Sequence, residues 1–140
     1  MKTLFDTNII LDLLLDREPF SNDAALLLSK VEQFEIIGFI CATTVTTIHY
    51  IATKALGSQA ASRHIQSLLS LFVIAPVNRV VLENAVSAKF ADFEDAVLHE
   101  AACHAGAKYI VTRNIGDFKK SKLPVFAPKE FVGVIESLKK

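Results

Sequence analysis

The fold is decided by the stretch Thr3-Leu4-Phe5-Asp6-Thr7-Asn8, which a helical apolar pattern follows at once. Its apolar start is typical of a short buried strand that would present the Asp6 carboxylate at its carboxyl end. Thr7 or Asn8 is a suitable N-cap for the helix that follows. In open parallel sheets, ligands and metals bind outside the carboxyl ends of the strands. Asp6 is therefore expected where such proteins carry out their chemistry.

The same alternation of strand and helix continues along the chain, without a linker or an internal repeat. We predict strands at residues 2–5, 35–41, 71–75 and 109–112, with a short edge strand at 124–127. We predict helices at residues 7–15, 43–56, 58–70, 79–89 and 92–105, one capped by Ser21, Asn22 or Asp23 that ends near residue 34, and one that starts at Pro128. Such alternation favours a mostly parallel sheet with helices on both faces. The predicted architecture is a three-layer α/β/α sandwich, built as a single domain over residues 1–140.

Composition excludes several classes of protein. The 15 basic and 15 acidic residues give a net charge of zero, which argues against gripping nucleic acid through the overall field of the protein. Apolar residues make up 51% of the chain, yet no apolar run approaches the roughly 18 residues that span a bilayer. The high share of apolar residues therefore indicates a buried α/β core or an oligomer interface. The N-terminus lacks the features of a secretory signal, so we expect a cytoplasmic protein with reduced thiols at Cys41 and Cys103.

Two acidic residues open the predicted helix at 92–105. Asp92 and Asp95 are three positions apart and therefore lie on nearly the same face of its first turn. Asp92 is also a good N-cap, so a purely structural role explains it equally well. Asp95 is followed by an apolar stripe, which indicates that this helix is largely buried. A buried carboxylate needs a partner, and a metal ion is one of the few adequate partners.

A third polar segment follows the apolar strand at 109–112. It places Asn114 and Asp117 in a loop at the carboxyl end of that strand. Asn, Gly and Asp are also common turn residues, so this loop is weak support when taken alone. Parallel strands carry their carboxyl ends on one edge of the sheet, and Asp6, the residues after Cys41 and the loop at 112–117 should share that rim.

Taken together, three motifs carry a resemblance to a known family. They are Asp-Thr-Asn at residues 6–8, Asp-Phe-Glu-Asp-Ala at 92–96 and Ile-Val-Thr-Arg-Asn-x-x-Asp-Phe at 110–118. Their order and spacing resemble the PIN-domain family of ribonucleases, which includes VapC-like toxins. The resemblance extends from Met1 to the closing Pro-Lys-Glu-Phe at residues 128–131.

The resemblance implies hydrolysis of RNA with Mg²⁺ or Mn²⁺ held by three or four acids. Clustered carboxylates suit such hard cations, and the metal would polarise the phosphate and activate a water nucleophile. Carried over by position, Asp6 and Asp95 are the primary ligands. The fourth family acid falls in the loop after Thr112, where this chain offers Asn114 with Asp117 close by. Asp6, Asp95 and Asp117 are the expected catalytic acids, and Asn114 completes the expected metal ligands.

The chain departs from the family pattern in the helix after the second strand. The family places a Glu or Asp there, and the nearest matching position in this chain is Thr47. A hydroxyl supplies no charge, although it can ligate weakly or hold a metal-bound water. Asp92 is a conceivable substitute for the missing acid, and we expect Asn8 and Thr112 to support the ligands. Arg113 lies within the acid-bearing loop and is the expected contact to RNA phosphate.

The resemblance therefore implies a metal-dependent endoribonuclease, the toxin of a type II toxin–antitoxin pair. The expected partners are an RNA substrate, a second copy of the chain in a homodimer and an antitoxin protein, with no membrane. The alternative is a catalytically weak or inactive PIN module that binds RNA or a protein partner. That alternative rests on Thr47 and Asn114, because two positions that carry acids in the family are neutral here.

Overall fold

Five strands form one sheet at the centre of the protein. The computed structural model describes residues 1–139. The strands are β1 (Lys2–Phe5), β2 (Ile37–Cys41), β3 (Val73–Ala75), β4 (Tyr109–Val111) and β5 (Val125–Phe126). Their order is β3-β2-β1-β4-β5, and every neighbouring pair is parallel. The predicted parallel sheet is confirmed, with β1 in its middle.

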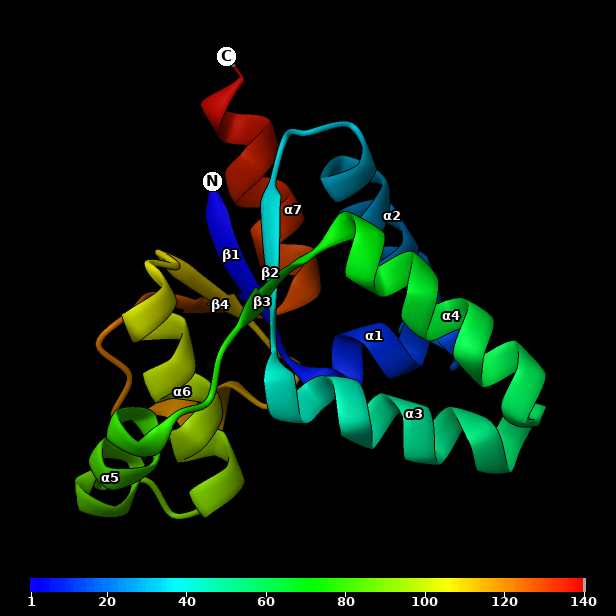
Figure 1. Cartoon of the computed structure of the whole chain (residues 1–140). Coiled ribbons are helices and arrows are strands. Elements are labelled where there is room, and N and C mark those ends of the chain that lie inside the picture. The colour runs from blue at the N-terminus through cyan, green and yellow to red at the C-terminus, as the bar shows by residue number, and fades with distance from the viewer. Residues whose placement is uncertain (140) are drawn as a thin grey trace.

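Helices cover both faces of this sheet, as predicted. They are α1 (Thr7–Leu14), α2 (Ser21–Glu32), α3 (Ala42–Leu56), α4 (Ser58–Leu71), α5 (Arg79–Ser87), α6 (Phe93–Ala105) and α7 (Pro128–Leu138). Figure 1 shows α5 and α6 on one side of the sheet and α1 to α4 on the other, where α7 also packs. None of the helices within residues 1–139 is long and apolar enough to cross a membrane.

The strands alternate between two apolar cores. Phe5 and Val111 pack with α1, α2, α3 and α7 in the larger core. Leu4 and Ile110 point to the opposite face, where they pack with α5 and α6. Successive side chains of a strand point to opposite faces, so both faces are apolar when both are covered. The burial of both faces explains why the strand segments are almost continuously apolar.

The structure corrects the expected start of α2. Ser21, Asn22 and Asp23 all lie inside the helix, and the N-cap residue is Phe20, whose side chain makes no capping hydrogen bond. The turn before the helix already has helical geometry, because the Ser21 amide donates to the carbonyl oxygen of Arg17 at 2.8 Å. A side-chain cap is therefore unnecessary at this point.

The loop after β4 also differs from the prediction. Residues 115–118 form a short 3₁₀ helix, η1 (Ile115–Phe118), rather than an irregular turn. Phe118 anchors η1 because its side chain is buried in the smaller core. One apolar residue at the end of a polar turn was too weak a pattern to predict a helix.

Close packing around Gly38 leads to a prediction about stability. A Cβ atom at this position in β2 would lie 2.6 Å from Cε1 and 2.7 Å from Cδ1 of Phe72. Phe72 is itself held edge-to-face against Phe5, with 5.5 Å between ring centroids. We expect Gly38→Ala to lower the free energy of unfolding by about 1–3 kcal/mol, measured by urea denaturation, because the ring must move.

Gly133→Ala is the matched control. Gly133 lies in α7, and apart from its chain neighbours and its own helix backbone no atom lies within 4 Å of an added Cβ there. Alanine should raise stability by up to about 1 kcal/mol through its higher helix propensity. Equal stability of Gly38→Ala and the wild type would contradict the packing seen here.

Candidate functional site

The topology of the sheet brings the predicted acidic segments together. The chain runs from β1 to β2 and β3 on one side, then crosses back to β4 on the other side of β1. Phe5 pairs with Val111, so the residues that follow these two strands emerge side by side. Open α/β sheets bind ligands at such a reversal in strand order. Asp6 and the segment after Thr112 lie at this point.

Asp6 is firmly held at the end of β1. It is the N-cap of α1, and its Oδ1 accepts a hydrogen bond from the Thr7 amide at 2.7 Å. Its Oδ2 accepts from the Thr112 hydroxyl at 2.7 Å and from Nδ2 of Asn8 at 3.4 Å. Thr112 and Asn8, which were predicted to support the ligands, both donate hydrogen bonds to Asp6, and their role at a metal site stays a prediction. Burial raises the pKa of Asp6, although the bonds from Thr112 and Thr7 oppose that rise.

A cavity of about 340 Å³ lies in front of Asp6, and we call it the acidic pocket. Its polar lining comes from α1, α3, the start of α6 and the segment after β4. The lining acids and amides are Asp6, Asn8, Asp92, Glu94, Asp95, Asn114 and Asp117. The structure thus gathers the predicted acids, together with Asn114, around one hollow.

Asp95 lies at the electrostatic centre of the acidic pocket. Its pKa is raised to about 7, first by burial and then by the negative charges of Asp6, Asp92, Asp117 and Glu94. Asp92 also has the structural role that its sequence position suggested, because its Oδ1 accepts from the Asp95 amide at 3.0 Å. Asp92 therefore caps α6 and also lines the acidic pocket, and its functional role stays a prediction.

Glu94 is the pocket residue that sequence reasoning missed. It lines the acidic pocket, and its charge raises the pKa of both Asp6 and Asp95. Helix spacing pairs Asp92 with Asp95 and gives no reason to select the acid between them. A usable signal was the presence of three acids at the start of one helix, where the helix dipole favours negative charge.

The structure does not bring Thr47 into the lining of the acidic pocket. Its hydroxyl donates to the carbonyl oxygen of Thr43 at 3.2 Å, within its own helix. The residues of α3 that line the pocket are Thr43 and Thr44, one turn closer to β2. Thr47 is therefore poorly placed to substitute for a carboxylate, and Glu94 and Asp92 supply the additional charge.

Arg113 forms an ion pair within the protein, and its expected contact to RNA phosphate stays a prediction. Its Nε and Nη2 donate to the buried Asp12 carboxylate at 2.6 and 3.1 Å. Its guanidinium group lies over the Phe20 ring, 4.0 Å from the centroid. Arg17, 3.8 Å from the same Asp12, is the basic residue that lines the acidic pocket. Arg113 is thus held by Asp12 and does not belong to the lining of the acidic pocket.

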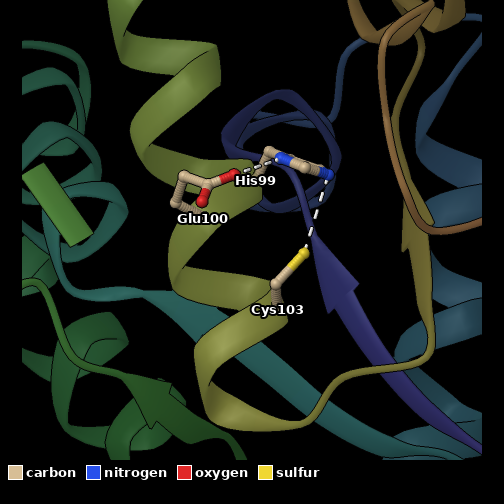
Figure 2. A group of neighbouring side chains, drawn as sticks. All are labelled: His99, Glu100 and Cys103. Atoms are coloured by element: carbon tan, nitrogen blue, oxygen red, sulfur yellow. Dashed lines mark hydrogen bonds and ion pairs between the residues drawn. The ribbon is translucent and has the colours of Figure 1, made fainter. Parts of the chain in front are cut away.

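Another group of potential metal ligands lies one turn further along α6. Figure 2 shows His99 between Glu100 and Cys103, and one ligand atom from each lies within 4.8 Å of the others. Both ring nitrogens are engaged, because Nε2 accepts from the Lys122 amide at 3.0 Å and Nδ1 lies 2.9 Å from Glu100 Oε2. This bonding places the ring proton on Nδ1. Burial also raises the pKa of the Cys103 thiol. His99 therefore fastens the segment around Lys122 to α6.

Comparisons with known proteins agree with this arrangement. A family model described as PIN domain matches residues 2–116. A toxin–antitoxin complex from Klebsiella pneumoniae shares 26% identity and a TM-score of 0.69, over 90% of this chain and 97% of that one. The FitAcB structure from Neisseria gonorrhoeae shares 22% identity and a TM-score of 0.70, over 91% and 98% of the two chains. No curated protein matched.

A more distant structure has the same fold. It is a VapC toxin from Mycobacterium tuberculosis, described as cleaving the sarcin-ricin loop, with 13% identity and a TM-score of 0.61. The alignment covers 77% of this chain and 86% of that one. The family match itself runs from β1 into η1, and so includes Asp6, Glu94 and Asp95. The chain belongs to the PIN domain family.

Proposed function

We propose that this protein is an endoribonuclease that depends on a divalent metal ion. The observation that carries the proposal is the convergence of Asp6, Glu94, Asp95 and Asp117 on the acidic pocket. These acids come from three separate parts of the chain, and they gather at the point where parallel sheets bind ligands. The family match and the solved toxin structures support RNA as the substrate.

The donor set of the pocket fits Mg²⁺ or Mn²⁺. All of its acids offer carboxylate oxygens, which hard divalent cations prefer, and Asn114 adds an amide oxygen. Burial is the main cause of the raised pKa of Asp95, and repulsion by the neighbouring carboxylates adds to it when no cation lies between them. A divalent ion would offset that repulsion. Asp6, Glu94, Asp95 and Asp117 are the residues that would hold it.

Each part of the site has a definite task in this proposal. A bound divalent ion supplies polarisation of the phosphate and activation of a water molecule. Thr112 and the Thr7 amide fix the Asp6 carboxylate in one orientation. Arg17 places a positive charge beside the acids, where it can contact a phosphate oxygen of the substrate.

The alternative of an inactive binding module is less well supported. It rested on the neutral residues Thr47 and Asn114 at two positions that carry acids in the family. Glu94 and Asp117 line the same pocket, so the negative charge that those positions lack is present nearby. The charge of the site therefore favours an enzyme.

We also propose a protein partner and a homodimer. Val80, Val86 and Phe93 form part of an exposed apolar surface on α5 and at the start of α6, with 51%, 74% and 53% exposure. Exposed apolar surface of this kind is typical of interaction sites. A solved structure described as a toxin–antitoxin complex supports an antitoxin as one partner. We further propose that the protein is a cytoplasmic toxin. Light scattering at micromolar concentration tests the dimer.

The central test is cleavage of a pool of tRNA and single-stranded RNA by the wild type and by Asp6→Asn, with Mg²⁺ or Mn²⁺. The substitution keeps the shape of the side chain but removes a charge that the metal needs. We expect cleavage to fall by about 100-fold or more. Equal cleavage by both proteins would refute the site, and a wild type that binds RNA but never cleaves it would refute the enzyme.

A second prediction separates Glu94 from Thr47. Glu94→Gln removes a carboxylate of the acidic pocket, and we expect it to weaken Mn²⁺ binding by about 10- to 100-fold, measured by titration calorimetry. Thr47→Val removes a hydroxyl that bonds only within α3, so Mn²⁺ affinity should stay the same. Weaker Mn²⁺ binding by Thr47→Val, with unchanged binding by Glu94→Gln, would instead show that position 47 takes part in metal binding.

A third prediction follows from the raised pKa of Asp95. The folded protein holds a proton on this carboxyl up to a pH of about 7, whereas the unfolded chain loses it near the ordinary value of 3.8. The metal-free folded state therefore binds more protons between these values and loses stability as pH rises through them.

Thermal melts of the metal-free protein between pH 5 and pH 8 measure this effect. The melting temperature should fall with pH more steeply for the wild type than for Asp95→Asn. Saturating Mn²⁺ should remove most of the difference, because the cation offsets the repulsion. Identical pH profiles for the two metal-free proteins would contradict the predicted electrostatic role of Asp95.

A further inference from the structure

A second cavity, of about 480 Å³, lies between the end of α5, the middle of α6 and the segment after η1. We call it the lysine cavity. Its lining includes Lys89, Phe90, His99, Glu100, Lys120 and Lys122. None of these six residues lines the acidic pocket.

Residues that line the lysine cavity and residues that line the acidic pocket are close in the sequence at two places. Lys89 precedes the pocket residue Asp92 by three positions, and Lys120 follows the pocket residue Asp117 by three. Three residues span at most about 11 Å between Cα atoms. On α6, Leu98 lines the acidic pocket and His99 lines the lysine cavity. A strand of RNA seated in one hollow can therefore continue into the other.

The charges of the lysine cavity suit an anion. Lys89, Lys120 and Lys122 make no ion pair within residues 1–139, whereas Lys30 and Arg113 are each held by acids. The acid in the lining, Glu100, is only 7% exposed and is occupied by the N–H of His99. The lining therefore contains three lysines without an ion pair in the described residues, and one buried carboxylate that already has a partner.

The segments that carry these lysines are fixed in place. His99 accepts from the Lys122 amide at 3.0 Å, and its ring stacks on Phe90, with 4.9 Å between centroids. Phe90 in turn packs edge-to-face on Phe118, at 5.9 Å. His99, whose place on α6 is seen in Figure 2, thus contacts the backbone of Lys122 on one side of the lysine cavity and the ring of Phe90 on the other. A pre-organised cavity loses less entropy on binding than three lysines on a mobile loop.

We propose that the lysine cavity binds a backbone phosphate of the RNA strand next to the phosphate that is cleaved in the acidic pocket. This proposal rests on the proposed ribonuclease function. The chain has no net charge, and its acidic pocket repels RNA until a cation is bound, so the strand needs a separate basic subsite. Lys89, Lys120 and Lys122 hold the strand while the acids act on it.

The test compares two triple variants in the cleavage-deficient Asp6→Asn background. One is Lys89→Gln/Lys120→Gln/Lys122→Gln. The control is Lys2→Gln/Lys54→Gln/Lys108→Gln, which makes the same change in net charge at exposed positions outside both cavities. The probe is a short labelled single-stranded RNA, and fluorescence anisotropy gives its Kd across a range of salt concentrations.

We expect the cavity variant to lower the slope of log affinity against log salt by about 0.7, because the cavity neutralises one phosphate and each neutralised single-strand phosphate adds about 0.7 to that slope. Between about 50 and 200 mM salt, the affinity of the parent should then fall by about 2.6-fold more than that of the cavity variant. The control should keep the slope of the parent. Equal slopes in the cavity variant and the parent would overturn the proposal.

Cleavage assays with Asp6 intact distinguish this proposal from the proposed function. The cavity variant should raise KM and leave kcat nearly unchanged, because the lysines bind the strand away from the reacting atoms. Cleavage by the wild type with no effect of the three lysines on KM or affinity would overturn the subsite and leave the nuclease standing. RNA binding that depends on the lysines, in a wild type that cleaves no RNA, would support the subsite and overturn the nuclease.

Discussion

The hydrogen bond from the Thr112 hydroxyl to Asp6, 2.7 Å long, joins the carboxyl ends of β1 and β4, and the arrangement of the site depends on it. The Asn114 amide donates to the same Thr112 oxygen at 3.0 Å, so the hydroxyl proton is directed at Asp6. One side chain thereby orients a carboxylate from the start of the chain and the beginning of the segment that carries Asp117. The parallel pairing of Phe5 with Val111 makes this contact possible, because it brings two segments from opposite ends of the sequence into register.

This scaffold is needed because the site works against the stability of the fold. The five carboxylates that line one pocket repel one another, and the charges of the other four add to burial in raising the pKa of Asp95 to about 7. Two local features limit the cost. Asp6 and Asp92 are N-caps of α1 and α6, where backbone amides and the helix dipole favour negative charge. Backbone amides therefore bind these two carboxylates whether or not a metal is present. The pocket can thus keep its shape while no cation offsets its negative charge.

The sequence predicts those parts of the fold and site that depend on neighbouring residues. The apolar run before Asp6 predicts β1, and Gly57 and Gly106 end helices at positive φ, as their positions indicate. Contacts between distant residues were not predictable. Arg113 looked free in the sequence because Asp12, the acid that binds it, lies 101 positions earlier. Glu94 was missed for a related reason. The direction of a side chain in the first turn of α6 depends on how that helix packs, and residue spacing alone does not give that direction.

The position of the basic residues follows from the same electrostatics. RNA is a polyanion, and a pocket built from carboxylates attracts it only when a cation reverses the local charge. Positive side chains inside the pocket would compete with that cation for the carboxylates, as Arg113 does for Asp12. A nuclease of this kind therefore benefits from keeping most of its basic residues outside the acidic pocket but within reach of the same strand. The lysine cavity meets that condition, since His99 fixes Lys122 to the helix that carries Asp95. A chain with no net charge can thus bind a polyanion, because its opposite charges occupy adjacent hollows.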